Sequence, residues 1–274
     1  MTLDSTDLRI LHFLQQDGRI SNQELAEKVA LSPSACLRRV QEMERSGLIR
    51  GYRAVLDPVK LIITNYPEGQ SELCHAPNHP LKPELGKRDM PFARELWIER
   101  EDFMEEPVKG FHRLYPGSMV RLRYGFVVKC TGCEKDAAGK ITAVLAEYMP
   151  DSRSGTPGAD NYKVKGNLHW VSAAHGYAAE VRIYDRLFAH PHPGQRREGD
   201  APDAERDFLT DINPDSKRVI TAYLEPALKD ARPEEHFQFE RHGYFVADRV
   251  DSKPGAPVFN RTVTLKDSWA KGGK

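Results

Sequence analysis

The sequence has few cysteines and no long hydrophobic run. No apolar stretch approaches the roughly eighteen residues that a membrane helix needs, and no charged-then-apolar leader begins the chain, so neither a membrane span nor secretion is indicated and a cytoplasmic protein is expected. Among four cysteines in 274 residues, Cys130 and Cys133 form the one C-x-x-C pair. Because no second pair stands at ligand spacing, a structural position beside a hairpin turn is favoured over a zinc or redox site.

Excess charge and convincing metal ligands are also missing. The 40 basic and 40 acidic residues cancel, so a polyanionic partner must be bound by local basic patches. His169 with His175, and His190 with His192, have no carboxylate or thiol at ligand spacing, so no metal and no cofactor is expected. With 39% hydrophobic residues, the chain can still bury a substantial core in two or three domains.

Helix signals come three times near the start of the chain. An apolar stripe over residues 5–17 predicts the first helix. Ser21 and Glu24 form a capping box that opens a short second helix. Ser32 is an N-cap with Pro33 at the first helical position, which predicts a third helix. The inward stripe of this third helix is expected to be Leu37, Val40 and Met43.

Three short helices followed by the alternating stretch LIRGYRAVL are typical of a winged helix-turn-helix, in which the third helix reads nucleic acid. This helix presents Ser34, Arg38 and Arg39 away from its apolar side. Residues 32–53 carry five basic and two acidic side chains, a modest positive patch on the reading element. The charge alone is equally typical of a solvated helix face; the cap spacing and the helix lengths favour the helix-turn-helix.

A family resemblance covers residues 3–58. The segments DGRISNQELA, LSPSACLRRV and GLIRGYRAVLDP resemble the DNA-binding domain of the leucine-responsive (Lrp/AsnC) family of bacterial regulators. The resemblance implies DNA contacts for Ser32, Ser34, Arg38 and Arg39. The effector-binding domain that also makes the oligomer in that family has no counterpart here. A single half-site reader is therefore expected to bind specific DNA weakly.

Beyond residue 61 the sequence changes to short alternating runs separated by turn residues. MVRLRYGFVVK, residues 119–129, places apolar side chains on one face and Arg121, Arg123 and Lys129 on the other, which predicts one strand with a basic face. Similar runs recur to the end of the chain, so a β-barrel or a pair of β-barrels is the expected architecture. Basic faces flanked by aromatic residues suit single-stranded RNA, although a solvated outer face explains this pattern equally well.

A second resemblance covers residues 54–272 in unbroken order. LDPVKLIITNYPEGQSE, GKRDMPFARELWIEREDF, KVKGNLHWVSAAH and VFNRTVTLKDSW resemble the carboxy-terminal half of glutaminyl-tRNA synthetases. In that family the region forms two antiparallel β-barrels that bind the anticodon arm of the tRNA. The resemblance implies tRNA contacts for Arg113, Arg121, Arg123, Gln238, Arg241 and Lys266. Arginine and glutamine suit this role because their planar ends meet base edges and phosphates in fixed geometry.

This sequence departs from the synthetase family at several expected contacts. Gly51 stands where the family has an arginine, with Arg50 and Arg53 as its basic neighbours. Lys266 replaces an arginine and loses the bidentate fork. In the segment KGFHR, residues 109–113, a glycine and a histidine stand where polar or basic contacts are expected. Softened anticodon selectivity is therefore expected.

The signatures of aminoacylation are absent from these 274 residues. The catalytic domain of the family binds ATP through HIGH-type and KMSK-type motifs, and neither occurs here, nor does a G-x-G-x-x-G or Walker loop. The resemblance to the synthetases therefore implies their anticodon-binding part without their chemistry, and a non-catalytic chain is expected.

The expected fold is α plus all-β, with a small winged helix-turn-helix head over residues 1–61 and two antiparallel β-barrels over residues 62–274. RAVLDPVKL, residues 53–61, suits both the last strand of the head and the first strand of the barrels. The leading hypothesis is a non-catalytic protein that binds the anticodon arm of glutamine tRNA, with duplex DNA as a second partner of the head. One alternative is an Lrp/AsnC-type DNA-binding regulator whose barrels are a body or partner surface. Another is an artificial chimera or assembly artefact with no selected function.

Overall fold

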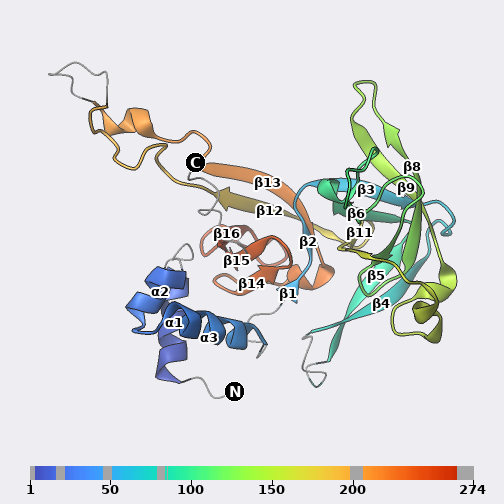
Figure 1. Cartoon of the computed structure of the whole chain (residues 1–274), viewed down its shortest axis with the longest axis horizontal. Helices are drawn as coiled ribbons and strands as arrows, with labels where there is room; N and C mark the ends of the chain where they lie inside the picture. The colour runs from blue at the N-terminus through green and yellow to red at the C-terminus, as the bar shows by residue number, and fades with distance from the viewer. Residues whose placement is uncertain are drawn as a thin grey trace.

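The computed structural model describes residues 4–16, 22–45, 51–78, 84, 86–197 and 206–263. Its first part is helical, with α1 (Ser5–Gln16), α2 (Asn22–Lys28) and α3 (Pro33–Arg45). The part described after residue 50 consists of strands joined by loops and short 3₁₀ turns (Figure 1). None of the described helices is long and apolar enough to cross a membrane.

The three head helices form where the capping signals predict them. The Ala35 N–H donates to the Ser32 hydroxyl oxygen at 3.2 Å, which confirms Ser32 as the N-cap of α3. The bounds of α1 also agree with the prediction. Ser21, the first residue of the predicted capping box, lies outside the described residues.

The head has a small apolar core that differs in one respect from the prediction. Its fully buried side chains include Ile10 of α1, Leu25 of α2 and Cys36 of α3. Leu37 was expected to face inward, but its side chain is 46% exposed. Cys36 takes the inward position of that turn, and Val40 packs on the core one turn later; the side chain of Met43 lies outside the described residues.

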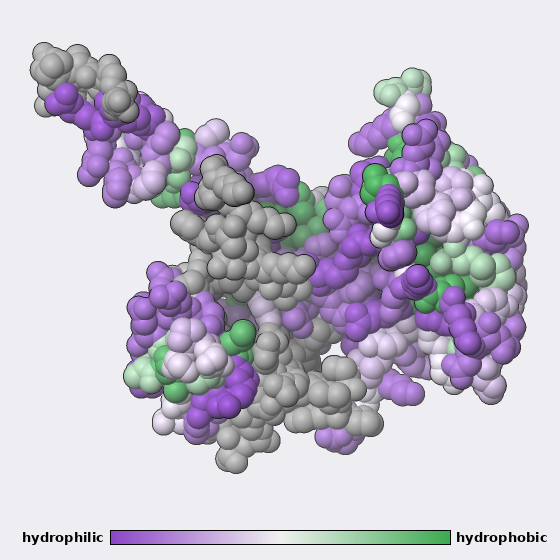
Figure 2. Space-filling model, in the orientation of Figure 1, coloured by the Kyte–Doolittle hydropathy of each residue, from purple (hydrophilic) through white to green (hydrophobic). Residues whose placement is uncertain are grey.

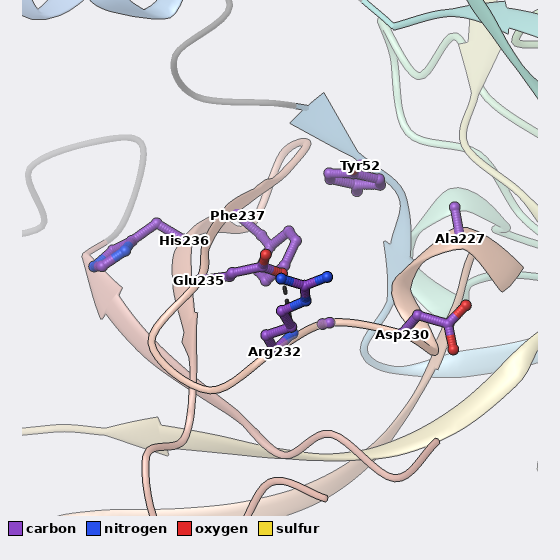
Figure 3. A pocket seen from close by; sticks show the side chains of 8 residues that line it. Tyr52, Ala227, Asp230, Arg232, Glu235, His236 and Phe237 are labelled. Atoms are coloured by element: carbon purple, nitrogen blue, oxygen red, sulfur yellow. Dashed lines mark hydrogen bonds between the residues drawn. The ribbon is translucent and has the colours of Figure 1, made fainter. Parts of the chain in front are cut away.

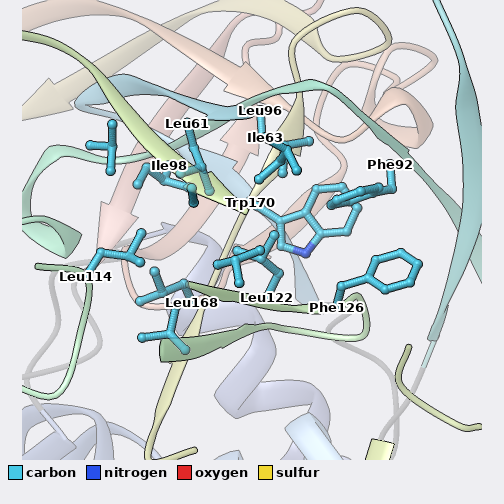
Figure 4. Packing of buried hydrophobic residues seen from close by; sticks show 14 of the residues in the cluster. Leu61, Ile63, Phe92, Leu96, Ile98, Leu114, Leu122, Phe126, Leu168 and Trp170 are labelled. Carbon is cyan, nitrogen blue, oxygen red and sulfur yellow. The ribbon is translucent and has the colours of Figure 1, made fainter. Parts of the chain in front are cut away.

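The first sheet of the body has seven strands in the order β10-β7-β8-β9-β3-β6-β11. Their bounds are β10 (Gly166–Leu168), β7 (Met119–Leu122), β8 (Val127–Lys135), β9 (Ile141–Tyr148), β3 (Pro58–Ile63), β6 (Glu95–Glu99) and β11 (Val171–Ser172). A separate hairpin of β4 (Ser71–Pro77) and β5 (Lys87–Ala93) adds to the same core. Figure 4 shows how Phe92 and Trp170 pack among the aliphatic side chains of this core; their ring centroids are 5.6 Å apart.

The second sheet also has seven strands, in the order β1-β14-β15-β16-β12-β13-β2. Their bounds are β1 (Gly51–Tyr52), β14 (His236–Phe239), β15 (Gly243–Ala247), β16 (Phe259–Val263), β12 (Tyr177–Tyr184), β13 (Lys217–Leu224) and β2 (Ala54–Val55). Phe239, Phe245 and Phe259 are fully buried at its centre. The rings of Phe239 and Phe245 stack with centroids 4.2 Å apart.

The prediction of two antiparallel β-barrels is correct only in part. Both sheets curl, but each is an open sheet with two end strands. Each also contains parallel pairs, β3 with β9 and β7 with β10 in the first sheet, β12 with β16 and β1 with β14 in the second. Alternation along a strand does not distinguish these arrangements, because it reports which side chains face the core and not how strand ends meet.

The basic run at residues 119–129 forms two strands instead of the single one predicted. β7 and β8 pair antiparallel on either side of a tight turn, in which the Gly125 N–H donates to the Leu122 carbonyl oxygen at 2.7 Å. Tyr124 takes a positive φ of 61° at this turn. The indole N–H of Trp170 donates to the Arg123 carbonyl oxygen at 3.0 Å and holds the turn against the core. Apolar residues alternate through the hairpin, so the pattern alone conceals the reversal.

The residues that join head and body contribute strands to both sheets. Gly51 of β1 pairs with Gln238, and Val55 of β2 pairs with Tyr223, both in the second sheet. β3 then lies between β6 and β9 of the first sheet. The stretch expected to close the head as a wing is therefore, from Gly51 onward, paired with the body (Figure 1). The domain boundary after residue 61 stays a prediction.

Candidate nucleic-acid interface

The two sheets meet along a line of aromatic and charged contacts. Trp97 of β6 stacks on Tyr223 of β13 with ring centroids 4.3 Å apart and an interplanar angle of 15°. Glu225, which follows β13, accepts a hydrogen bond of 2.5 Å from the Arg88 guanidinium and one of 2.9 Å from the Arg53 main-chain N–H. These contacts join the first sheet, the second sheet and the β4–β5 hairpin. They therefore fix the relative positions of the side chains where the two sheets meet.

Glu99 fixes the joining segment from the other side. Its carboxylate accepts the main-chain N–H groups of Leu56 at 2.7 Å and Asp57 at 3.0 Å, and its Oε1 lies 2.9 Å from His242 Nε2. Burial raises the pKa of Glu99, but the His242 and main-chain hydrogen bonds outweigh it and hold the pKa below its usual value. The carboxylate therefore stays ionised and ties the joining segment to the β14–β15 turn.

Arg53 is fully buried in this region. Its guanidinium lies over the Tyr124 ring at 4.7 Å from the centroid, 3.6 Å from Glu225, and contacts the Met90 sulfur. Its Nε and Nη2 have no hydrogen-bond partner among the described residues. Burial lowers the pKa of Arg53, against the opposing attraction of Glu225. The Arg53 guanidinium is therefore withdrawn from the surface, and its contacts lie within the protein.

Arg113 and Arg241, two predicted tRNA contacts, share the same carboxylates. Arg113 Nη1 lies 2.5 Å from Asp102 Oδ1, and Arg241 Nη1 lies 2.8 Å from Asp102 Oδ2. Both guanidiniums also reach Glu101, at 3.2 and 2.5 Å. Burial raises the pKa of Asp102, while its pairs with Arg241 and Arg113 oppose the shift. Two arginines, one from the segment between β6 and β7 and one from the β14–β15 turn, are thus brought together.

Arg123 lies beside a buried histidine. Its Nη1 is 2.7 Å from Glu240 Oε2 and 3.4 Å from His169 Nε2. His169 is 5% exposed, and its Nδ1 has no partner in the part of the chain that the structure describes. Burial lowers the pKa of His169 to about 2, with Arg53 and Arg123 adding to the shift. The neutral imidazole therefore accepts a hydrogen bond from Arg123 through Nε2, although Glu240 lies only 3.5 Å away.

The other predicted tRNA contacts that the structure describes have different partners. Arg121 donates to the carbonyl oxygens of Ser152 at 2.7 Å and Ala159 at 2.8 Å, so its guanidinium braces the loop after β9. Gln238 of β14 faces the Tyr244 hydroxyl at 3.5 Å. Lys266 lies outside the described residues.

The predicted DNA contacts divide into exposed and occupied side chains. Ser32, Ser34 and Arg38 are exposed at the start and along the outer side of α3. Arg39 is bound to α1 and its preceding residue, with Nη1 2.7 Å from Asp4 Oδ2 and 2.8 Å from Asp7 Oδ1. Because Asp7 is 1% exposed, this ion pair holds α3 against α1.

The remaining candidate sites from the sequence carry no cluster of ligands. In the described ranges no group of three histidine, cysteine or acidic residues could hold a metal ion. Cys130 and Cys133 lie within β8, on either side of a bulge and shortly before the β8–β9 hairpin turn, as expected. Burial raises the pKa of the Cys130 thiol. A reactive thiolate is therefore not favoured at this position.

The second sheet also borders an open pocket of about 510 Å³ (Figure 3). Its described lining comprises Tyr52, Ala227, Asp230, Ala231, Arg232, Glu235, His236 and Phe237. The Arg232 main-chain N–H donates to Glu235 at 3.0 Å across one wall. This lining includes none of the six predicted tRNA contacts. Hydrophilic side chains predominate on the face of the molecule seen in Figure 2, and hydrophobic ones form small separate patches.

Sequence reasoning missed the acidic partners that position the arginines. Asp102 and Arg241 are 139 residues apart, and Arg123 and Glu240 are 117 apart in the printed sequence. No spacing or periodicity links residues at such separations. The buried carboxylate of Glu99 lies at the end of β6 and that of Asp102 just after it, in the segment LWIEREDF, but alternation assigns them no partner. Their role is visible only once the two sheets are folded against each other.

Comparisons with known proteins agree with the division of the chain into a helical head and a β-stranded body. Residues 51–149 and 167–248 match two family models, each described as tRNA synthetases class I (E and Q), anti-codon binding domain. Residues 3–50 match a winged helix-turn-helix DNA-binding model. The fold and these matches define a class of protein in which a helix-turn-helix precedes a nucleic-acid-binding β body.

The chain contains an N-terminal winged helix-turn-helix domain and two anticodon-binding domains of the class I (E and Q) tRNA synthetase family. It is 67% identical over 218 residues to the glutamine–tRNA ligase of Cupriavidus taiwanensis and 66% identical over 218 residues to that of Cupriavidus metallidurans. It is 59% identical over 217 residues to the ligase of Bordetella avium. These alignments cover 79 to 80% of this chain but 36% of each relative, and they leave out the catalytic part.

Proposed function

We propose that this chain is a non-catalytic nucleic-acid-binding protein that binds the anticodon arm of glutamine tRNA through residues 51–263. The observation that carries the proposal is the meeting of Arg113, Arg123 and Arg241 where the two sheets join. Guanidiniums held in fixed orientation suit base edges and phosphates, which they can bind through two hydrogen bonds at once. The similarity to glutamine–tRNA ligases supports glutamine tRNA as the partner.

The five described candidate contacts have different proposed parts. Arg113, Arg123 and Arg241 contact the RNA directly. Arg121 acts through the loop that it braces, because its guanidinium is already bound to two carbonyl oxygens. Gln238 offers its amide beside Tyr244. Lys266 is proposed as an electrostatic contact on the basis of its position in the sequence alone.

Binding to three nucleic acids tests the proposal. The purified chain is titrated by fluorescence anisotropy with glutamine tRNA, a non-cognate tRNA and a duplex DNA, across a salt series. A preference for glutamine tRNA that survives non-cognate competitor supports the proposal. Equal and steeply salt-dependent binding to all three contradicts it, because nonspecific phosphate contacts behave in this way. Formation of glutaminyl-tRNA from ATP and glutamine by the chain would show that it is catalytic.

The head supports a second proposed activity, binding of duplex DNA. Ser32, Ser34 and Arg38 lie exposed on α3, the helix that enters the major groove in proteins of this class. This favours the regulator alternative, with the body as a partner surface. A gel shift with wild type and Arg38→Ala on duplex DNA tests it. Loss of binding in the variant supports a reading role for α3, and unchanged binding excludes Arg38 from it.

A further inference from the structure

Two arginines and two carboxylates alternate at the meeting of the sheets. Arg113 comes from the segment between β6 and β7, and Arg241 from the β14–β15 turn. Each guanidinium touches both Asp102 and Glu101. Arg241 also holds a positive φ of 75°, a conformation that is costly for a residue with a side chain. The two carboxylates therefore set the positions of both guanidiniums.

The two carboxylates differ in exposure. The Asp102 side chain is fully buried, whereas the Glu101 side chain is 67% exposed. An ion pair of an exposed carboxylate contributes little, typically less than about 1 kcal/mol. Removing a buried carboxylate leaves the two arginines without their shared anchor, which costs considerably more. Solvent or a ligand can thus replace Glu101 easily and Asp102 only with difficulty.

With Glu101 displaced, two guanidiniums and Asp102 leave one net positive charge. That charge matches one phosphodiester group, and the guanidiniums of these partly exposed side chains, 37% for Arg113 and 23% for Arg241, can meet its oxygens. We propose that Glu101 occupies the place of an RNA phosphate and competes with it, while Asp102 is the positioning residue that holds Arg113 and Arg241 for the phosphate. This inference rests on the proposed tRNA-binding function and names the control of that same site.

The two carboxylates predict opposite results when each is neutralised. Glu101→Gln removes the competitor and is expected to tighten glutamine tRNA binding roughly threefold to fivefold, as expected for the removal of a surface ion pair. Asp102→Asn releases both arginines and is expected to weaken binding about tenfold. It also lowers the slope of log affinity against log salt by roughly 0.7 for each single-stranded RNA phosphate that the variant no longer binds. A purely structural role for Asp102 leaves that slope unchanged.

Glu106→Gln is the matched control. Glu106 is exposed in the same segment and its neutralisation changes the net charge by the same amount as Glu101→Gln. Affinities of wild type and the three variants are measured by anisotropy with glutamine tRNA and with a non-cognate tRNA. Tighter binding by Glu101→Gln than by Glu106→Gln supports the inference, and it stands even if Asp102→Asn fails to fold.

Two outcomes separate this inference from the function on which it rests. If wild type prefers glutamine tRNA but Glu101→Gln binds no more tightly than Glu106→Gln, the inference is overturned and the proposed function remains. If wild type shows no preference for glutamine tRNA, the proposed function is overturned together with the inference.

Discussion

Replacing Arg53 with methionine is expected to stabilise the protein. The Arg53 side chain is fully buried, and two of its three nitrogen atoms have no partner among the described residues. Methionine has a similar length, fills the space against Tyr124 and Met90, and carries no charge. Glu225 keeps the residue 53 main-chain N–H and the Arg88 guanidinium as donors. The substitution therefore removes a buried cation without isolating the carboxylate beside it.

The size of the effect follows from opposing contributions. An unpaired buried polar group costs about 1–3 kcal/mol. Against this gain, Arg53→Met removes a cation–π interaction worth about 0.5–2 kcal/mol and the attraction of Glu225 across 3.6 Å. Exchanging buried ion pairs for apolar side chains is often stabilising by about 1–4 kcal/mol. We expect the free energy of unfolding to rise by about 1–3 kcal/mol, equivalent to a Tm increase of roughly 2–8 °C.

Urea unfolding followed by tryptophan fluorescence measures this change. Trp97 reports the region directly, because its indole stacks on Tyr223 across the two sheets. Arg88→Met is the matched control: it removes the donor that lies 2.5 Å from Glu225, and it is expected to destabilise by about 3–5 kcal/mol. If Arg53→Met destabilises the protein as much as Arg88→Met does, the Arg53 guanidinium is well satisfied and the reasoning is refuted.

Three further predictions concern the head, the buried histidine and the relation between the two ligands. Arg39→Ala is expected to lower the thermal stability of the head, because it leaves the buried Asp7 without its ion-pair partner. Arg38→Ala is expected to reduce duplex DNA affinity in a gel shift at unchanged stability. Equal effects of the two variants on stability and on DNA affinity would contradict these separate roles. His169 is neutral when folded because burial depresses its pKa, so below pH about 6.5 the unfolded state binds a proton that the folded state does not, and stability falls by up to about 1.4 kcal/mol per pH unit. Urea titrations of His169→Gln between pH 6.5 and 4.5 should show a shallower decline, and parallel curves would exclude this histidine. Gly51 pairs with Gln238, and five residues separate it from α3, so α3 can lie no more than about 20 Å from this strand. Duplex DNA on α3 and glutamine tRNA on the body should therefore displace each other in competition anisotropy. A ternary complex on a sizing column would show that they do not.

The local elements of this fold could be predicted from the sequence where one side chain determines the conformation. Ser32 followed by Pro33 predicts the start of α3, and the hydrogen bond from the Ala35 N–H confirms it. Capping is a contact over three residues, so it depends on nothing distant. Inward orientation was less predictable: Cys36 is buried beside the exposed Leu37, because a modest rotation of the helix about its own axis exchanges which of two neighbouring residues faces the core.

The arrangement of the strands could not be predicted in the same way. The turn at Tyr124 and Gly125 reverses the chain within an unbroken alternation, and the pairing of β3 with β9 is parallel across about 80 residues. The arginines of the candidate site are recognisable from their motifs. Their attachment to Glu101, Asp102 and Glu240 depends on two sheets meeting, which no local pattern encodes.

The strands that follow the head also determine the order in which the chain can fold during synthesis. Gly51 is made about 190 residues before Gln238, its partner in the second sheet. At 5–20 residues per second this is a delay of roughly 10–40 s. The head helices and the first sheet have their partners available much earlier, since β3 needs only residues up to Ala146. For that interval β1 and β2 have no strand to pair with, and β3 is already paired while the two strands before it wait.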